Sequence, residues 1–314
     1  MENNNEAIEL RREGLYFAPG NFYLDPVLPV ETAVVSHAHA DHFVNGHKTV
    51  YCTPPTSTLN QQRMKNYYGR KVTFEYHQPF TISNSTVEFI PAGHILGSAQ
   101  VLFTHADKRY LYTGDFKLAP DKSCEPFEFV KADVLITETT FAENGLKHPS
   151  DVDEIKKLNQ YTDLNIIIGV YALGKAQRIT QLINEFCPDK KVMVHRNISS
   201  FNRIYESAGY NLGKWSAYDK HEFRKMRNII YLLPPAHSRN FYPQPWYLRA
   251  FASGWEHLQS GFDFKLYISD HADWFDILNL VEKTGAKEIY TIHGDGEQLK
   301  AHLSDKGFNV TLLK

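Results

Sequence analysis

Six consecutive residues constrain this chain of 314 residues more than any other feature. His37, His39, Asp41 and His42 lie within this segment, separated only by alanine. Imidazole and carboxylate groups are the ligands that zinc and its first-row neighbours prefer. Residues 32–35, directly before the cluster, are apolar and β-branched, which predicts a short buried strand. A loop at the end of that strand can direct two of these side chains to one metal ion and two to a second. We therefore predict a two-metal site; a solvated polar loop is the alternative.

Three more ligand candidates stand where strand-like segments end. Each follows an apolar or alternating run, and they are His94, Asp115 and His293. Taken singly, each is an ordinary loop residue. Behind the histidine cluster they supply the ligands that a two-metal site still lacks.

The composition bounds the class of protein. Hydrophobic residues make up 42% of the chain and aromatic residues 13%, as in a globular enzyme with one large or two ordinary domains. The N-terminal residues are polar and lack the apolar core of a secretory signal, and no stretch approaches the roughly 18 apolar residues of a membrane helix. The three cysteines are scattered, which argues against a disulfide framework. We expect a cytoplasmic protein with no membrane partner.

The distribution of charge indicates a polyanion as partner. Residues 171–260 contain 13 Lys and Arg against 6 Asp and Glu, a surplus of 7 positive charges, although the net charge of the chain is −2. Such a segment is typical of nucleic-acid binding, with a solvated helical face as the alternative. The candidate phosphate contacts are Lys175, Arg178, Arg196, Arg203 and Arg239. Three aromatic residues are candidates either for base stacking or for core packing, namely Tyr171, Tyr242 and Trp246.

The order of the expected elements indicates an insertion. Residues 1 to about 160 read as short strands with turns. Strands then alternate with helices, which predicts a small α/β unit with a parallel sheet. We expect strands at 165–171, 191–195 and 229–233 and helices at 175–186 and 201–208. A strand at 266–269 and a helix at 276–284 follow, so the strand-then-ligand pattern lies on both sides of this unit.

One segment imitates a nucleotide-binding motif. Residues 169–175 match the first seven positions of a phosphate-binding P-loop, but the eighth position is Ala176, which has no hydroxyl for magnesium. We therefore reject an NTPase. A helix that begins at Lys175 can still hold a substrate phosphate at its N-terminus.

Taken in order, the motifs resemble a known family. They are HAHADH at 37–42, GHILGSA at 93–99, TGDF at 113–116, TET at 137–139, SDHADW at 269–274 and HG at 293–294. This series resembles the β-CASP branch of metallo-β-lactamase nucleases. YALGKAQR at 171–178 and FASGW at 251–255 look like the bacterial ligase-associated DNA exonucleases within that branch. The resemblance implies an α/β fold, a metallo-β-lactamase αββα sandwich formed by residues 1–150 and 259–314, with a compact β-CASP-like α/β cap inserted at 151–258.

The resemblance also assigns roles to individual residues. It implies one metal bound by His37, His39 and His94, and a second bound by Asp41, His42 and His293, with Asp115 bridging the two. Glu138 and His271 match the positions of a carboxylate–histidine pair beside the metals, which makes Asp41, Glu138 and His271 the candidate catalytic residues. Asp25 matches an early aspartate that supports the histidine loop from behind.

The activity implied is that of a DNA exonuclease that acts in repair on single-stranded DNA or DNA ends. It would use two divalent metal ions, zinc or alternatively manganese, and would act with a DNA ligase and a helicase. His271, oriented by Glu138, would protonate the leaving oxygen while the metals activate water. An RNA-processing nuclease of the same branch is the alternative favoured by histidine at position 293. A small-molecule metallo-hydrolase and an inactive binding subunit are weaker alternatives. The polarity of cutting, and exonuclease against endonuclease action, stay open.

Overall fold

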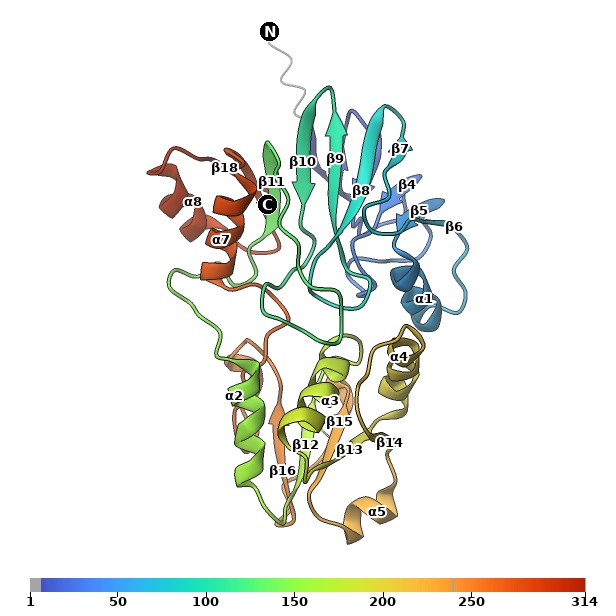
Figure 1. Ribbon diagram of the computed structural model, residues 1–314, viewed down its shortest axis with the longest axis vertical. Helices are drawn as coiled ribbons and strands as arrows, with labels where there is room; N and C mark the ends of the chain where they lie inside the picture. The colour runs from blue at the N-terminus through green and yellow to red at the C-terminus, as the bar shows by residue number, and fades with distance from the viewer. Residues whose placement is uncertain (1–6, 239, 314) are drawn as a thin grey trace. The chain divides into compact units, whose positions relative to one another are not determined.

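The computed structural model describes residues 7–238 and 240–313, which form two compact units (Figure 1). Unit 1 contains the described residues up to 120, residues 124–147 and the described residues from 271 onward. Unit 2 contains residues 121–123 and 148–270. The domain limits expected at 150/151 and 258/259 stay a prediction; unit 2 itself ends at Asp270.

Unit 1 is built on two sheets. The first has six strands in the order β1-β2-β3-β4-β5-β6. These are β1 (Ile8–Arg11), β2 (Gly14–Phe17), β3 (Phe22–Leu24), β4 (Thr32–Val34), β5 (Thr49–Cys52) and β6 (Arg70–Thr73). The second has seven strands in the order β18-β17-β11-β10-β9-β8-β7. These are β7 (Phe80–Ile82), β8 (Ser85–Pro91), β9 (Ala99–His105), β10 (Lys108–Tyr112), β11 (Val134–Glu138), β17 (Glu288–Ile292) and β18 (Asn309–Leu312).

The two sheets pack face to face through an aromatic cluster. Phe103 of β9 is fully buried and its ring meets Phe17 of β2 and Phe22 of β3 edge-on, with centroids 4.6 and 5.6 Å apart. Tyr110 of β10 stacks on the same ring at 5.2 Å. Because side chains alternate along a strand, Phe103 and its neighbour Leu102 face opposite sides of the second sheet. The sheet is therefore buried on both faces.

Helices cover the outer face of the second sheet. Helix α7 (Trp274–Thr284) and helix α8 (Glu297–Ser304) pack there, with Ile277, Leu280 and Leu299 in the same cluster as Leu102 (Figure 1). Asp273 caps α7 by accepting hydrogen bonds from the backbone of Phe275 and Asp276, which explains where this helix begins. Helix α1 (Pro54–Arg63) follows β5 of the first sheet.

Unit 2 is a parallel α/β unit. Its sheet has the order β14-β13-β15-β12-β16, and every pairing in it is parallel. The strands are β12 (Asn165–Gly169), β13 (Lys191–Val194), β14 (Trp215–Ala217), β15 (Ile229–Leu233) and β16 (Tyr247–Phe251). One face is covered by α2 (Asp151–Lys156), α3 (Lys175–Phe186) and α4 (Arg196–Ser207), and the other packs against α5 (Lys220–Lys225). Shorter helical turns are η1 (Lys157–Gln160), α6 (Pro235–Ser238) and η2 (His257–Gln259).

One expectation about an element is wrong, and one is right about the helix but not about where it begins. The strand expected at 266–269 is an isolated bridge between Leu266 and Ala252, because the rest of that segment has no ladder partner. The helix expected at 201–208 is longer and begins at Arg196, since His195 caps it through the backbone N–H of Asn197.

No helix in the described part of the chain is long and apolar enough to cross a lipid bilayer.

Replacing Phe103 by alanine tests the packing between the sheets. The change removes the ring that contacts both sheets and leaves a cavity, so the free energy of unfolding should fall by about 3–5 kcal/mol. Phe129→Ala is the control, because that side chain is 45% exposed. Urea denaturation followed by circular dichroism measures both variants, and equal, small effects would contradict the described packing.

Candidate metal centre

Strand direction brings the candidate ligands of unit 1 to one edge of the second sheet. Strands β8 and β10 both pair antiparallel with β9, so they run the same way, and β10, β11 and β17 are mutually parallel. The residues at or just beyond the ends of these four strands are His94, Asp115, Glu138 and His293. The histidine loop follows β4 of the first sheet, and the Ser36 carbonyl accepts a hydrogen bond from the backbone N–H of Ala99 (2.8 Å).

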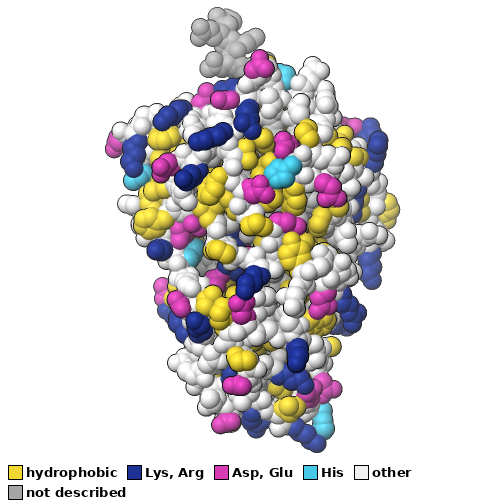
Figure 2. Space-filling model, in the orientation of Figure 1, with side chains coloured by type: hydrophobic (Ala, Val, Ile, Leu, Met, Phe, Trp, Pro, Cys, Tyr) yellow, Lys and Arg dark blue, Asp and Glu magenta, His cyan; other side chains and the backbone are white. Residues whose placement is uncertain are grey.

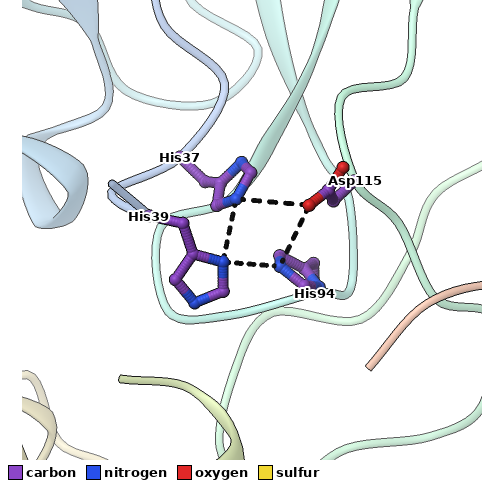
Figure 3. Close-up of side chains that lie close together, drawn as sticks. All are labelled: His37, His39, His94 and Asp115. Carbon is purple, nitrogen blue, oxygen red and sulfur yellow. Dashed lines mark hydrogen bonds and ion pairs between the residues drawn. The ribbon is translucent and has the colours of Figure 1, made fainter. Parts of the chain in front are cut away.

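Three imidazoles and a carboxylate converge at this edge (Figure 3). The Nδ1 atom of His39 lies 3.1 Å from Nε2 of His37 and 3.1 Å from Nε2 of His94. Oδ2 of Asp115 lies 3.6 Å from the His37 nitrogen and 3.8 Å from the His94 nitrogen. His37, His94 and Asp115 are buried, and His39 is half-buried.

The same oxygen of Asp115 faces a second histidine. Nε2 of His42 lies 3.3 Å from Oδ2 of Asp115, and the ring of His293 packs against the ring of His42 with centroids 5.1 Å apart. One carboxylate oxygen therefore lies between the His37–His39–His94 group and His42. This is the position that a bridging ligand would occupy.

Asp25 fixes the tautomers of two of these histidines. Its carboxylate accepts hydrogen bonds from Ser36 N (2.7 Å), Ser36 Oγ, Tyr112 Oη (2.8 Å) and His42 Nδ1 (2.8 Å). Because the Ser36 hydroxyl donates to Asp25, it accepts from Nδ1 of His37 (2.9 Å). Both histidines thus carry a proton on Nδ1 and direct Nε2 towards Asp115.

The ionisation of the cluster follows from this geometry. Burial, with the positive charge of His42, holds the pKa of His37 well below its usual value. Burial by itself also lowers the pKa of His42, but the carboxylates of Asp115 and Asp25 outweigh it and raise that pKa well above its usual value. Burial would raise the pKa of Asp115, yet the rings of His42, His271 and His37 keep it well below its usual value.

These residues fit a divalent metal. With metal–nitrogen bonds of roughly 2.0–2.1 Å, two nitrogens on one tetrahedral ion lie roughly 3.3–3.4 Å apart. The 3.1 Å from the His39 nitrogen to those of His37 and of His94 is close to this spacing. The neutral form of His42 sets a lone pair against a carboxylate oxygen, an arrangement that needs a proton or a cation between the two atoms. The donor set of imidazole and carboxylate suits zinc and manganese.

Asp41 and His293 are the less settled ligand candidates. The side chain of Asp41 is 79% exposed, with Oδ2 3.8 Å from Nε2 of His42. His293 is exposed and has a φ of 54°, in the left-handed region. Among the described residues, neither belongs to the groups whose donor atoms converge. Their assignment to a second metal stays a prediction.

The carboxylate–histidine pair lies directly beside the cluster. Oε2 of Glu138 accepts from Nδ1 of His271 (2.9 Å), and Oε1 of Glu138 accepts from the backbone N–H of Phe116 (2.8 Å). Glu138 is fully buried, whereas the His271 side chain is 28% exposed. Nδ1 of His271 also lies 3.9 Å from Oδ2 of Asp115. The His271 ring is therefore partly open to solvent.

The candidate phosphate contacts divide into two kinds. Lys175 and Arg178 are about 4% exposed and are paired with buried carboxylates, which argues against the expected phosphate contacts because their charged ends are already neutralised. Arg196 and Arg203 are exposed and stay candidates. Arg239 lies outside the described residues. On the face drawn in Figure 2, basic and acidic side chains of the described residues intermingle.

The aromatic candidates also differ in exposure. Tyr171 is 50% exposed and Tyr242 is 78% exposed, so both stay candidates for stacking on a base. Trp246 packs edge-on against Phe223 and Tyr247, with centroids 5.6 and 4.7 Å away. Core packing, the alternative reading, therefore describes Trp246.

Several functional residues lack a signal that the sequence analysis used. Ser36 and Tyr112 bind Asp25, yet neither is a ligand type, and only their places beside ligands could have indicated them. Gly93 has a φ of 70°, and a Cβ there would lie 2.4 Å from the carbonyl oxygen of Lys117. Any other residue at that position would displace the adjacent His94.

Comparison with known families identifies the superfamily of this chain. Residues 8–195 match the model of the beta-lactamase superfamily domain, which is more than half of the chain. The chain belongs to the beta-lactamase superfamily. The resemblance to β-CASP metallo-β-lactamase nucleases that the motifs indicated is confirmed, as is the expected fold class, an αββα sandwich with an inserted α/β unit.

The similar proteins of this superfamily are mostly longer than this chain. A "Probable DNA ligase" of Opitutus terrae is 28% identical over 95% of this chain and 30% of its own length. An "RNase J-like protein" of Methanocaldococcus jannaschii is 29% identical over 52% of this chain and 45% of its own. The "5' exonuclease Apollo" of Gallus gallus is 30% identical over 48% of this chain and 35% of its own. The chain thus spans less than half the length of these curated relatives.

A solved structure shares the fold. It is a protein of unknown function from Enterococcus faecalis V583, with a TM-score of 0.63 and 14% identity. The match covers 90% of this chain and 79% of the other. At this identity the likeness speaks for the fold alone.

Replacing Asp25 by asparagine tests the tautomer argument. The amide NH₂ would meet donors where the carboxylate now accepts, so metal affinity should fall roughly 10–100-fold. Tyr112→Phe is the matched control, because it removes one hydrogen bond and keeps the carboxylate. Competition with a chelating dye measures the affinity, and an unchanged value for Asp25→Asn would show that the histidine loop holds its tautomers without it.

Proposed function

We propose that this chain is a metal-dependent phosphodiesterase, a DNA exonuclease that acts on DNA ends in repair. The observation that carries the proposal is the shared position of Oδ2 of Asp115, with Nε2 of His37, His42 and His94 and Nδ1 of His271 all within 3.9 Å. In the proposed assignment, His37, His39 and His94 hold one divalent ion, and Asp41, His42 and His293 hold another. Asp115 bridges the two.

The bound cations would supply charge neutralisation of the phosphodiester and a lower pKa for a coordinated water. Zinc is the proposed metal and manganese the alternative, since both accept this donor set. Asp25 binds Nδ1 of His42 directly and Nδ1 of His37 through Ser36, so both rings turn Nε2 towards the place where a cation would bind. Burial of the cluster strengthens every charge interaction within it.

The protein's own contribution to bond breaking is proton transfer by His271. Glu138 holds Nδ1 of His271, and Nε2 of this partly exposed ring would donate a proton to the leaving oxygen. The second oxygen of Glu138 is held by the backbone N–H of Phe116, one residue after Asp115. Glu138 therefore links the proposed acid, His271, to the segment that carries Asp115.

The choice of DNA rests on the relatives. The name of the Opitutus terrae protein is that of a DNA ligase, and Apollo is named a 5′ exonuclease. The first name supports DNA as substrate and a DNA ligase as partner, and the second supports attack at an end. A helicase partner and a cytoplasmic location are proposed from the motif resemblance alone. An RNA nuclease is the second candidate, favoured by the RNase J-like relative and by "Endoribonuclease YSH1" of Gibberella zeae, which is 26% identical over 55% of this chain.

Replacing His271 by alanine separates catalysis from metal binding. Loss of the proton donor should lower kcat roughly 10²–10⁴-fold while the bound metal stays. His77→Ala is the matched control, because His77 belongs to the same unit but pairs with Glu88 and Glu128 outside the cluster. Turnover and metal content, measured by mass spectrometry of the metal, are compared. Loss of both in His271→Ala would make His271 a ligand instead.

End-labelled substrates decide between the two nucleic acids. We expect single-stranded DNA to be degraded from an end in zinc or manganese, with little cutting of an RNA of the same sequence. Product ladders give the polarity and separate exonuclease from endonuclease action. Preferential cutting of the RNA would replace the DNA proposal with the second candidate, and removal of metal by a chelator is the control that should abolish either activity.

A further inference from the structure

Arg178 of helix α3 lies at the centre of a buried ionic cluster in unit 2. Its guanidinium pairs with Asp121 (Nε–Oδ2, 3.5 Å), Asp270 (Nη1–Oδ1, 3.6 Å) and Asp151. It also donates to the carbonyl oxygen of Ser269 (3.0 Å). Arg178 is 4% exposed, and the three carboxylate side chains are at most 12% exposed. One carboxylate would suffice to pair this cation, so three that converge on it indicate a role beyond charge balance.

The three carboxylates mark the places where the chain passes between the units. Asp121 is the first residue of the short segment 121–123. Asp151 is the fourth residue after the chain enters unit 2 again at His148. Asp270 is the last residue before the chain leaves it. A single side chain of unit 2 therefore binds residues at or near three of the four points where the chain crosses between the units.

Lys175, one helical turn before Arg178, holds the exit passage more firmly. Its Nζ donates to the carbonyl oxygen of Ile268 (3.0 Å) and lies 3.5 Å from Oδ2 of Asp270. Side chains three residues apart lie on the same face of a helix, so both cations of α3 contact the segment 268–270. The residue that follows this clamped segment is His271.

The same two passages meet again inside unit 1. The backbone N–H of Ala272 donates to the carbonyl oxygen of Phe116 (2.8 Å). The N–H of Phe116 donates to Glu138, which accepts in turn from His271. The segment that leads to Asp121 and the segment that leaves Asp270 thus converge on the Glu138–His271 pair.

We propose that Arg178 is a positioning residue for His271, acting through the carboxylates of Asp121, Asp151 and Asp270. It restrains the segment that ends at Asp270, the residue directly before His271 in the chain. The catalytic part of this inference rests on the proposed function. A displacement of about 1 Å in a catalytic group lowers a rate by roughly 10²-fold, so a clamp of this kind is expected to act on kcat.

The first arm of the test needs no activity. Hydrogen–deuterium exchange is measured in the full chain, loaded with zinc, for wild type, Arg178→Lys, Arg178→Gln and a control, Lys190→Gln. Lys190 is a buried cation of the same unit that bonds to Tyr161 and Asn228 instead. Peptides that cover residues 116–120 and 269–273 should exchange faster in both Arg178 variants and at the wild-type rate in the control. Unchanged exchange in both Arg178 variants overturns the proposal.

The second arm compares two phosphodiesters. DNA has a sugar alkoxide as leaving group and needs a proton donor, whereas thymidine 5′-(p-nitrophenyl phosphate) releases p-nitrophenolate without one. Arg178→Lys should lose roughly 10–100-fold in kcat on DNA, with KM little changed, and little on the nitrophenyl ester. Equal losses on both substrates would mean general damage and overturn the positioning role.

Two further variants keep the outcomes distinct. Lysine retains the charge of Arg178 but not its planar fork, so Arg178→Lys carries the test if Arg178→Gln does not fold. Asp270→Asn keeps the size of the side chain and should give the same substrate pattern through the exit passage alone. If wild type cuts neither substrate, the proposed function fails, while the exchange arm still decides whether Arg178 holds these segments.

Discussion

The buried carboxylate of Asp25 is the interaction on which the candidate metal centre depends. A buried carboxylate is tolerated only when its oxygens are fully hydrogen-bonded, and Asp25 accepts from Ser36, His42 and Tyr112. Asp25 binds Nδ1 of His42 directly and Nδ1 of His37 through Ser36. It therefore decides which nitrogen of each ring faces Asp115. The φ of Asp25 is 43°, a conformation that aspartate adopts more readily than most residues. Strain at this position is consistent with a site that is assembled before any ligand arrives.

Strand direction does the remaining placement. The carboxyl ends of parallel strands meet at one edge of a sheet, and here β8, β10, β11 and β17 share a direction although they are far apart in sequence. His94, Asp115, Glu138 and His293 thus lie at or just beyond the ends of strands that have ladder partners on both sides. Gly114, with a φ of 54°, admits Ser36 against the chain where a Cβ would lie 2.7 Å from it. This close packing of Gly114 against Ser36 holds the backbone directly before Asp115 in place.

The sequence indicated the parts of this site that depend on residue type and strand ends. His37, His39, His94 and Asp115 could be found because ligand chemistry is visible in the side chains, and helix α3 because its apolar spacing is regular. The roles of Lys175 and Arg178 could not be predicted, because the sequence does not distinguish a surface cation from a buried one. Only the fold brings the carboxylates of distant segments to these two side chains. The prediction of a strand at 266–269 is wrong for a related reason. An apolar run predicts burial, but only a ladder partner makes it a strand. Tertiary partners, which no local pattern encodes, account for these differences.

Burial, the tautomers of the histidines and the charge of Asp115 together favour the binding of cations at the centre. Asp115 is kept ionised by the surrounding rings, while His37 is kept neutral by burial. His42 resolves its conflict with Asp115 by taking up a proton, which a cation would displace. Binding of a metal ion at this centre would release protons. The free energy of that binding would stabilise the folded state of unit 1. The polar cluster that would otherwise weigh against folding becomes, with a cation bound, a stabilising element of the sandwich edge.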